Sequence, residues 1–136
     1  MALPFIFQNR DFNMPIVYHQ GNVFDSPARV IFHGANCQNT FGSGLAKEMK
    51  ERYPEAYQAD LRTIRGDASK LGTFSYAFSK TDNRILFNLY TQNYYGRDKR
   101  YLDYQALADS LIALKTSLTA MKILPTEMVA SGRIGA

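Results

Sequence analysis

The sequence contains no tryptophan and only one cysteine, Cys37, among its 136 residues. A single cysteine cannot form a disulfide within the chain, which fits a reducing compartment such as the cytoplasm. Cys37 and the two histidines do not have the spacing of metal ligands. We therefore expect a cytoplasmic protein without a structural zinc ion, and nothing in the sequence calls for another metal or a cofactor.

Long apolar runs are also absent, and none approaches the ~20 residues of a membrane span. The start, MALPFIFQNRDF, has a short apolar patch but neither the basic leader nor the cleavage site of a signal peptide. We expect residues 1–13 to form an N-terminal arm. A composition of 46% hydrophobic and 21% charged residues is typical of a soluble globular protein. The length predicts a single domain over residues 1–136.

Acidic residues are fewer than basic ones, and the formal net charge is +4. Most basic residues are dispersed, which is typical of a solvated surface. One small cluster contains Arg97, Lys99 and Arg100, interrupted by Asp98. A modest positive charge favours anionic ligands in general, whereas nucleic-acid binding usually shows a basic stripe with a recognisable motif. We therefore do not expect nucleic acid to be the main partner.

Two stretches carry the periodicity of helices. Apolar residues recur every four positions from Leu45 onward, which predicts an amphipathic helix over residues 44–59. Pro54 is expected to break this helix or to start a new turn, because proline lacks the N–H that a helix interior uses. The clearest helix is predicted over 103–121, where apolar residues repeat at three-four spacing and Asp103 can cap the first turn.

Strands are predicted on both sides of these helices, so that strands and helices alternate along the chain. This order favours an α/β layered fold with a mixed sheet, in which ligands bind at the carboxyl ends of strands. Two Gly-rich segments, 34–44 and 132–135, follow predicted strands and should lie at that edge together. The predicted strands cover residues 14–21, 29–34, 72–80, 84–92 and the segment EMVA after Pro125.

Gly42, Ser43 and Gly44 stand at the start of the first predicted helix. Glycines let main-chain N–H groups approach an anion closely, and a helix N-terminus adds free donors and a partial positive charge. The segment could cradle a phosphate or diphosphate. It is neither a Walker P-loop nor a complete dinucleotide fingerprint, so a flexible turn is an equally good interpretation of the spacing.

Three segments together resemble the macrodomain family: HGANCQNTFGSGLAKEMKERYP, GDASKLGTFSYA and NLYTQNYYGRDKRYLDYQAL. The resemblance covers about residues 15–136 and is closest to the branch of ADP-ribose-1''-phosphate phosphatases and related phage and bacterial proteins. It implies ADP-ribose binding and a three-layer α/β fold with a mixed central sheet. Compared with the family pattern, the chain lacks the last helix, strand and helix, so we expect a truncated macrodomain with one uncovered sheet face that favours self-association.

The resemblance also implies positions for the ligand. Asn22 stands where the family has an acidic residue that meets the adenine amino group, and Val23 would offer its main-chain N–H to the ring. Asn36 corresponds to an asparagine that contacts the distal ribose, and Asn39 lies further along the same loop. The remaining implied ligand contacts, most of them in the loops that hold the diphosphate, are Gly42, Ser43, Gly44, Leu45, Thr91, Gly132, Ile134 and Gly135.

His33 is the candidate for catalysis, because the phosphatase branch has a histidine at this point of the strand. A histidine can act as a general acid or nucleophile, although a lone strand-end histidine is as readily a structural residue. The acidic residue that pairs with this histidine in the family would follow Gly135 and is absent. Cys37 lacks the nearby arginine of cysteine phosphatases, so we interpret it as a packing residue.

Two main hypotheses follow from the resemblance. The first is an ADP-ribose-1''-phosphate phosphatase or de-ADP-ribosylating hydrolase that uses His33. The second is a module that binds ADP-ribose without catalysis, which the missing acidic residue favours. A weaker alternative is a binder of RNA or poly-ADP-ribose that uses Arg97, Lys99 and Arg100, and steep salt dependence would distinguish it.

Overall fold

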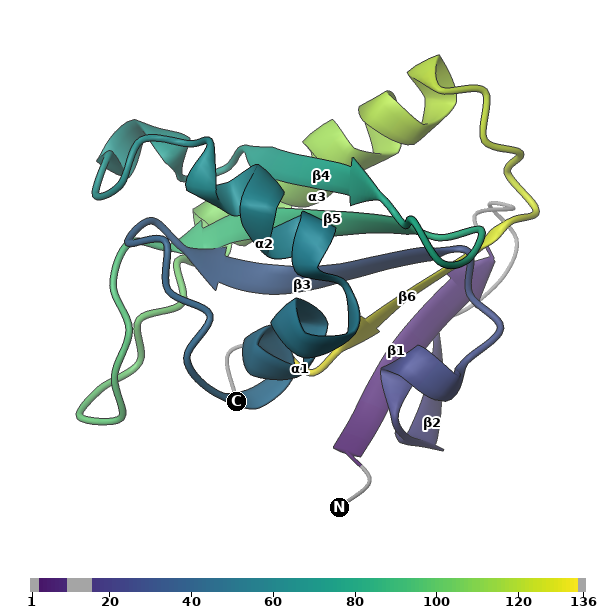
Figure 1. Ribbon diagram of the computed structural model, residues 1–136, viewed down its shortest axis with the longest axis horizontal. Helices are drawn as coiled ribbons and strands as arrows, with labels where there is room; N and C mark the ends of the chain where they lie inside the picture. The colour runs from purple at the N-terminus through teal and green to yellow at the C-terminus, as the bar shows by residue number, and fades with distance from the viewer. Residues whose placement is uncertain (1–2, 10–15, 135–136) are drawn as a thin grey trace.

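A six-stranded mixed sheet with helices on both faces forms the centre of the computed structural model, which describes residues 3–9 and 16–134 (Figure 1). The strand order is β2-β1-β6-β3-β5-β4. β3 runs parallel to both β5 and β6, and the other neighbouring strands pair antiparallel. The strands are β1 (Leu3–Asn9), β2 (Val17–Gly21), β3 (Val30–Asn36), β4 (Phe74–Phe78), β5 (Ile85–Gln92) and β6 (Met128–Gly132).

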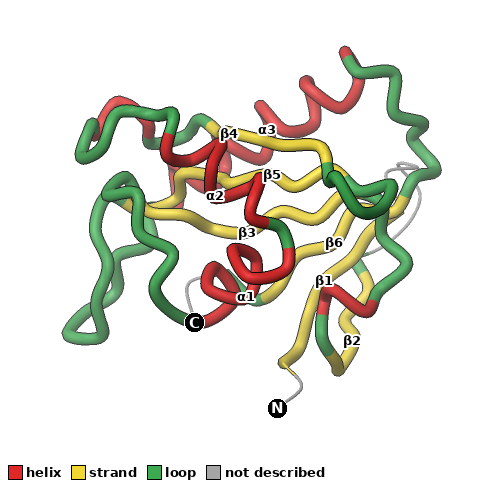
Figure 2. Tube along the Cα trace, in the orientation of Figure 1, coloured by secondary structure: helices red, strands yellow, loops and turns green. Residues whose placement is uncertain are grey.

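Helices α1 (Gly44–Arg52) and α2 (Pro54–Leu61) lie on one face of the sheet and α3 (Tyr104–Ala120) lies on the other (Figure 2). The three-layer arrangement expected from the sequence is therefore confirmed. The single helix predicted over 44–59 is instead two helices, because Pro54 begins α2 at its first turn, where the missing N–H costs no helical hydrogen bond. Two short 3-10 turns, η1 (Val23–Asp25) and η2 (Ala68–Lys70), complete the elements.

Two hydrophobic cores hold these layers together, one on each face of the sheet. β3 contributes to both, since Ile31 packs toward α1 and α2 while Val30 packs toward α3, and both residues are fully buried. The strand predicted over 29–34 is thus buried on both faces. Asp103 caps α3 as predicted, because its carboxylate accepts a hydrogen bond from the main-chain N–H of Ala106 at 3.0 Å.

The expectation of an N-terminal arm over residues 1–13 is wrong for residues 3–9. These residues form β1, which pairs antiparallel with β2 on one side and with β6 on the other. Both hydrogen-bonding edges of β1 are thus satisfied inside the sheet, which favours a strand over an arm. The rest of the predicted arm lies outside the described residues.

The carboxyl ends of β3, β5 and β6 meet at one edge of the sheet, as the sequence predicted for the two Gly-rich segments. Gly132, at the end of β6, lies directly against Leu45 of α1: a Cβ atom on Gly132 would stand 2.4 Å from Leu45 Cδ2. The start of α1 therefore packs on the end of β6, and a larger residue at position 132 would require the Leu45 side chain to shift. Gly135 lies outside the described residues.

Candidate functional site

The loop from β3 to α1, residues 37–43 (loop 1), is open at its C-terminal end. Gly42, Ser43 and Gly44 are exposed, and a Cβ on either glycine would meet no described atom within 4 Å. Gly44 has a φ of +59°, a conformation that favours glycine. The Ser43 side chain makes no capping hydrogen bond to any described residue. Within the described residues, the first-turn N–H groups of α1 therefore have no helical or side-chain partner.

The two asparagines of this segment hold loop 1 in shape. Asn36 donates from Nδ2 to the hydroxyl and carbonyl of Thr40, at 2.8 and 3.2 Å, and accepts from the N–H of Gln38 at 2.8 Å. Asn39 has a φ of +57° and donates from Nδ2 to the carbonyls of Asp60 and Thr63. Both side chains therefore form their hydrogen bonds with other groups of the protein. Their direct role is to position the loop.

A buried polar network supports Asn39 from behind. Lys70 Nζ donates to Asn39 Oδ1 at 2.8 Å and lies 5.0 Å from the centroid of the Tyr90 ring. The Tyr90 hydroxyl donates to Asp60 Oδ1 at 2.7 Å and lies 2.8 Å from Ser75 Oγ. Burial raises the pKa of Asp60, while the Tyr90 hydrogen bond and the charge of Lys70 partly oppose this change. Burial likewise raises the pKa of Tyr90.

Sequence reasoning missed this network because its five members come from five separate segments of the chain. Asp60 lies near the end of α2, Lys70 in η2, and Tyr90 in β5. Each residue type is common at a protein surface, and no motif joins them. The available signal was that Asp60 and Lys70 precede the strand predicted over 72–80. Such a pair of charges has no specific structural meaning before the fold is known.

His33 lies beneath loop 1 rather than at the surface. Its side chain is 1% exposed, and its Nε2 is 2.6 Å from Asn88 Oδ1. Asn88 Nδ2 donates to Ala56 O and Ser75 Oγ, both at 2.9 Å. These two acceptors orient the Asn88 amide so that its oxygen faces His33. From this network we assign the hydrogen of the imidazole to Nε2.

The environment keeps His33 neutral at physiological pH. Burial lowers its pKa from 6.5 to about 4, although the Asn88 hydrogen bond acts in the opposite direction. Phe41 of loop 1 meets the imidazole edge-on, with ring centroids 5.0 Å apart. Nδ1 has no hydrogen-bond partner in the described part of the chain. His33 is thus bonded to an amide, and its lone pair is enclosed by the protein.

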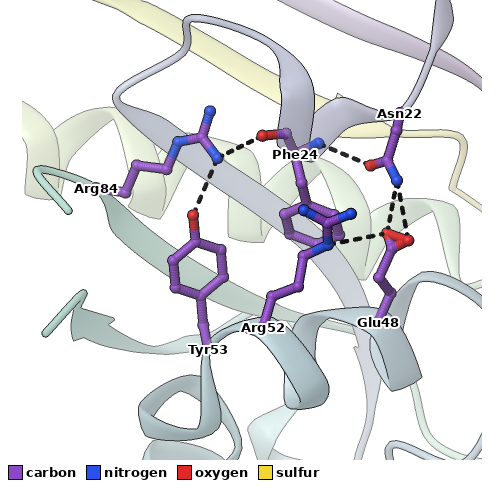
Figure 3. Close-up of polar contacts among 6 residues, drawn as sticks. All are labelled: Asn22, Phe24, Glu48, Arg52, Tyr53 and Arg84. Carbon is purple, nitrogen blue, oxygen red and sulfur yellow. Dashed lines mark hydrogen bonds and ion pairs between the residues drawn. The ribbon is translucent and has the colours of Figure 1, made fainter. Parts of the chain in front are cut away.

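Asn22 stands beside an acidic residue that the sequence analysis did not single out (Figure 3). Its Nδ2 donates to the two carboxylate oxygens of Glu48 at 2.9 and 3.0 Å, and its Oδ1 accepts from the N–H of Phe24 at 2.9 Å. Val23 is buried. Glu48 lies one turn after Leu45 on α1, and the Arg52 Nε lies 3.8 Å from its carboxylate. A negative charge therefore neighbours Asn22 after all.

On the other face of the sheet, Thr91 lies beside Gly34 of β3, close to Ile134, which follows β6. A Cβ on Gly34 would stand 2.8 Å from Thr91 Oγ1 and 3.2 Å from Ile134 Cγ2, so these three residues meet closely. The Thr91 hydroxyl is buried and has no hydrogen-bond partner within the described residues.

Cys37 is fully buried in the core that contains α1, and burial raises the pKa of its thiol. Its interpretation as a packing residue is confirmed.

Comparisons with known proteins agree with this fold. No family model matches the chain. It is 34% identical over 128 residues to an "Uncharacterized 17.5 kDa protein in tk-vs intergenic region" of Enterobacteria phage T4, covering 90% of this chain and 79% of the phage protein. Among solved structures, the macrodomain of Thermus aquaticus DarG superposes with a TM-score of 0.61 at 17% identity, covering 75% of this chain and 67% of that one. The macrodomain of Mycobacterium tuberculosis DarG superposes with a TM-score of 0.62 at 16% identity, covering 76% of this chain and 68% of that one.

The chain has the macrodomain fold. Short matches also link this macrodomain to proteins named ADP-ribose 1''-phosphate phosphatase. The match in Ajellomyces capsulatus is 45% identical over 40 residues, 29% of this chain and 16% of that protein. The match in Aspergillus clavatus is 35% identical over 54 residues, which are 37% of this chain and 27% of that protein. The chain thus matches only a small part of these phosphatases.

A surface hollow of 340 Å³ lies beside loop 1 of this macrodomain, lined by Phe41, Gly42, Lys47, Lys50 and Glu51. It places two cations next to the open end of the loop. The described part of the chain contains no group of three or more His, Cys, Asp or Glu side chains that could hold a metal. None of the described helices is long and apolar enough to cross a bilayer.

Proposed function

We propose that this macrodomain binds ADP-ribose, with the diphosphate on loop 1 and the first turn of α1. The observation that carries the proposal is the open segment at Gly42–Gly44. Its glycines leave the main chain uncovered, and the helix N-terminus supplies donors and partial positive charge. In the neighbouring hollow Lys47 and Lys50 outnumber the carboxylate of Glu51, which leaves a net positive charge that favours an anionic ligand.

In this proposal the ligand lies along one side of α1. Leu45 lies against Gly132, and Glu48 bonds Asn22 on the next turn. The nucleotide would extend from the α1 N-terminus toward Asn22, and Gly132 and Ile134 would close the diphosphate site from β6. Asn36 and Asn39 would act by fixing loop 1, since their side chains already hydrogen-bond within the protein.

Gly42 allows a sharp test of this site. A side chain at Gly42 meets no described atom within 4 Å, so Gly42→Glu should fold normally while placing a carboxylate against the diphosphate. We expect this variant to weaken ADP-ribose binding at least about tenfold in calorimetry, since like charges at a binding site cost several kcal/mol. Gly42→Gln has nearly the same shape without the charge and should retain more affinity. Equal affinity of both variants and the wild type would place the ligand elsewhere.

For the activity, we propose hydrolysis at the distal ribose, with ADP-ribose 1''-phosphate or an ADP-ribosylated side chain as the substrate and His33 as the catalytic group. Because the imidazole is 1% exposed, Phe41 and loop 1 must move before His33 can reach a substrate. Release of phosphate from ADP-ribose 1''-phosphate should fall at least about 100-fold in His33→Gln. Calorimetry on the same variant separates lost turnover from lost binding, and undiminished turnover would remove His33 from the mechanism.

The alternative is an ADP-ribose-binding module without catalysis. The surroundings of His33 favour it, because the ring is neutral, enclosed and bonded to an amide oxygen. A general acid or base at neutral pH normally has a pKa near the working pH, and His33 has a pKa of about 4. Tight binding of ADP-ribose by the wild-type protein, with no phosphate released, would decide for this function.

A further inference from the structure

The loop between β5 and α3, residues 93–103 (the tyrosine loop), exposes aromatic rings that no core requires. Tyr94 is 56% exposed and Tyr95 is 51% exposed. Their rings are stacked, with centroids 6.0 Å apart and planes inclined by 20°. Because more than half of each residue is exposed, the pair offers aromatic surface to solvent. Such a pair is a platform on which a further flat ring can stack.

Cations accompany these rings on the same loop. Lys99 Nζ lies 5.1 Å from the centroid of the Tyr101 ring, and the Arg100 guanidinium lies 5.7 Å from that of Tyr104. Arg97 is exposed nearby. The carboxylate within this cluster, Asp98, accepts a hydrogen bond from the Tyr101 hydroxyl at 2.7 Å. The loop therefore presents three cations against two carboxylates, Asp98 and the α3 cap Asp103, each of which already accepts a hydrogen bond.

The tyrosine loop is fixed at both ends. Gln92 Nε2 donates to the carbonyl of Tyr94 at 2.8 Å, and the N–H of Asp103 donates to the carbonyl of Thr91, also at 2.8 Å. The N–H of Cys37 bonds the carbonyl of Gln92 at 3.1 Å, which joins the base of the loop to loop 1. Figure 1 shows the loop projecting beyond the sheet at this edge. Anchored ends reduce the ordering entropy that a ligand must overcome.

We propose that the tyrosine loop binds a single-stranded, base-bearing polyanion, with a base stacked on the Tyr94–Tyr95 pair and phosphates on Arg97, Lys99 and Arg100. Stacking on aromatic side chains tolerates any base and requires an exposed base face, which a duplex does not offer. Single-stranded RNA and an ADP-ribose polymer share this chemistry. The sequence alone gave only a short, interrupted basic cluster, whereas the structure adds free aromatic faces beside it.

Fluorescence anisotropy with a labelled 15-nucleotide adenine RNA and with a labelled ADP-ribose polymer of similar length tests the proposal. Replacing both stacked tyrosines should weaken binding of the proposed ligand roughly tenfold or more. Replacing the three cations should make the slope of log K against log salt shallower by about 2, since each phosphate contact in a single strand contributes about 0.7. The variants are Tyr94→Ala with Tyr95→Ala, and Arg97→Ala with Lys99→Ala and Arg100→Ala.

Matched controls remove the same groups from other exposed sites. Tyr18, which is 71% exposed on β2, serves as the aromatic control. Arg62, Arg65 and Lys115, all exposed, serve as the charge control. These controls, each changed to alanine, should bind like the wild type. Absence of binding at low salt, equal losses in the controls, or equally tight binding of a duplex would overturn the proposal.

The two ligand sources give different results in the same experiment. Binding of either RNA or polymer that is lost with the tyrosines supports the site and identifies its ligand. Binding of the polymer alone that survives loss of the tyrosines but is abolished by Gly42→Glu would instead assign the polymer to loop 1 and refute the tyrosine loop. If the Gly42→Glu variant still binds RNA, the tyrosine loop binds its ligand independently of the proposed ADP-ribose site.

Discussion

Acidification should destabilise this macrodomain through His33. The pKa of His33 is about 4 in the folded protein and 6.5 in an ordinary environment. Between these values the unfolded chain binds the proton more readily, so the free energy of unfolding falls as the pH falls. Each pKa unit corresponds to about 1.4 kcal/mol. The full contribution is therefore about 3 kcal/mol, present above pH 6.5 and lost by about pH 4.

Urea unfolding between pH 4 and 8 measures this effect when the wild type is compared with His33→Gln. Glutamine does not titrate, so the difference between the two proteins isolates His33 from the carboxylates. The comparison also removes the contribution of Asp60, which is the same in both proteins. The raised pKa of Asp60 acts in the opposite direction and favours the folded state in acid. NMR titration of the imidazole gives the folded pKa directly. A stability difference that is constant across this range would refute the assigned neutral, enclosed ring.

Three further changes test other contacts by urea unfolding at neutral pH. Thr91→Val should stabilise by about 1 kcal/mol, because the buried hydroxyl has no partner among the described residues; a loss would reveal a hidden hydrogen bond. Tyr90→Phe should cost about 2 kcal/mol by removing a donor from buried Asp60, and an unchanged midpoint would argue against that bond. Arg84→Lys should cost about 2 kcal/mol, since an ammonium cannot span the main-chain carbonyls of Phe24, Ser26 and Ala28 that the guanidinium binds; full stability would contradict these three hydrogen bonds.

The elements that local chemistry determines were predictable from the sequence. Asp103 caps α3 because an aspartate before an apolar three-four repeat satisfies the first-turn N–H groups. Pro54 separates α1 from α2 for an equally local reason. The two Gly-rich segments meet at one edge because strands β3 and β6 run parallel and end there. These features depend on a few neighbouring residues or on a general rule of sheet topology.

The interior of the site was not predictable, because it depends on pairings between distant segments. Asn88 fixes the tautomer of His33 from 55 positions away, and Glu48 meets Asn22 across 26. β1 was mistaken for an arm because its short apolar run gains its partners only when β6 lies beside it. In each case the residue has several good local interpretations, and the tertiary neighbour selects one of them.

The position of β6 in the sheet has a consequence for how the protein folds during synthesis. β6 comes after the other five strands in the chain, yet it lies between β1 and β3 and bonds both. Until the ribosome has released Met128–Gly132, the β1–β2 hairpin and the β3–β5–β4 portion have no strand to join them. Until then the nascent chain exposes two unpaired strand edges, one on β1 and one on β3. Slow translation through α3 prolongs this exposure and should therefore increase the demand for chaperones.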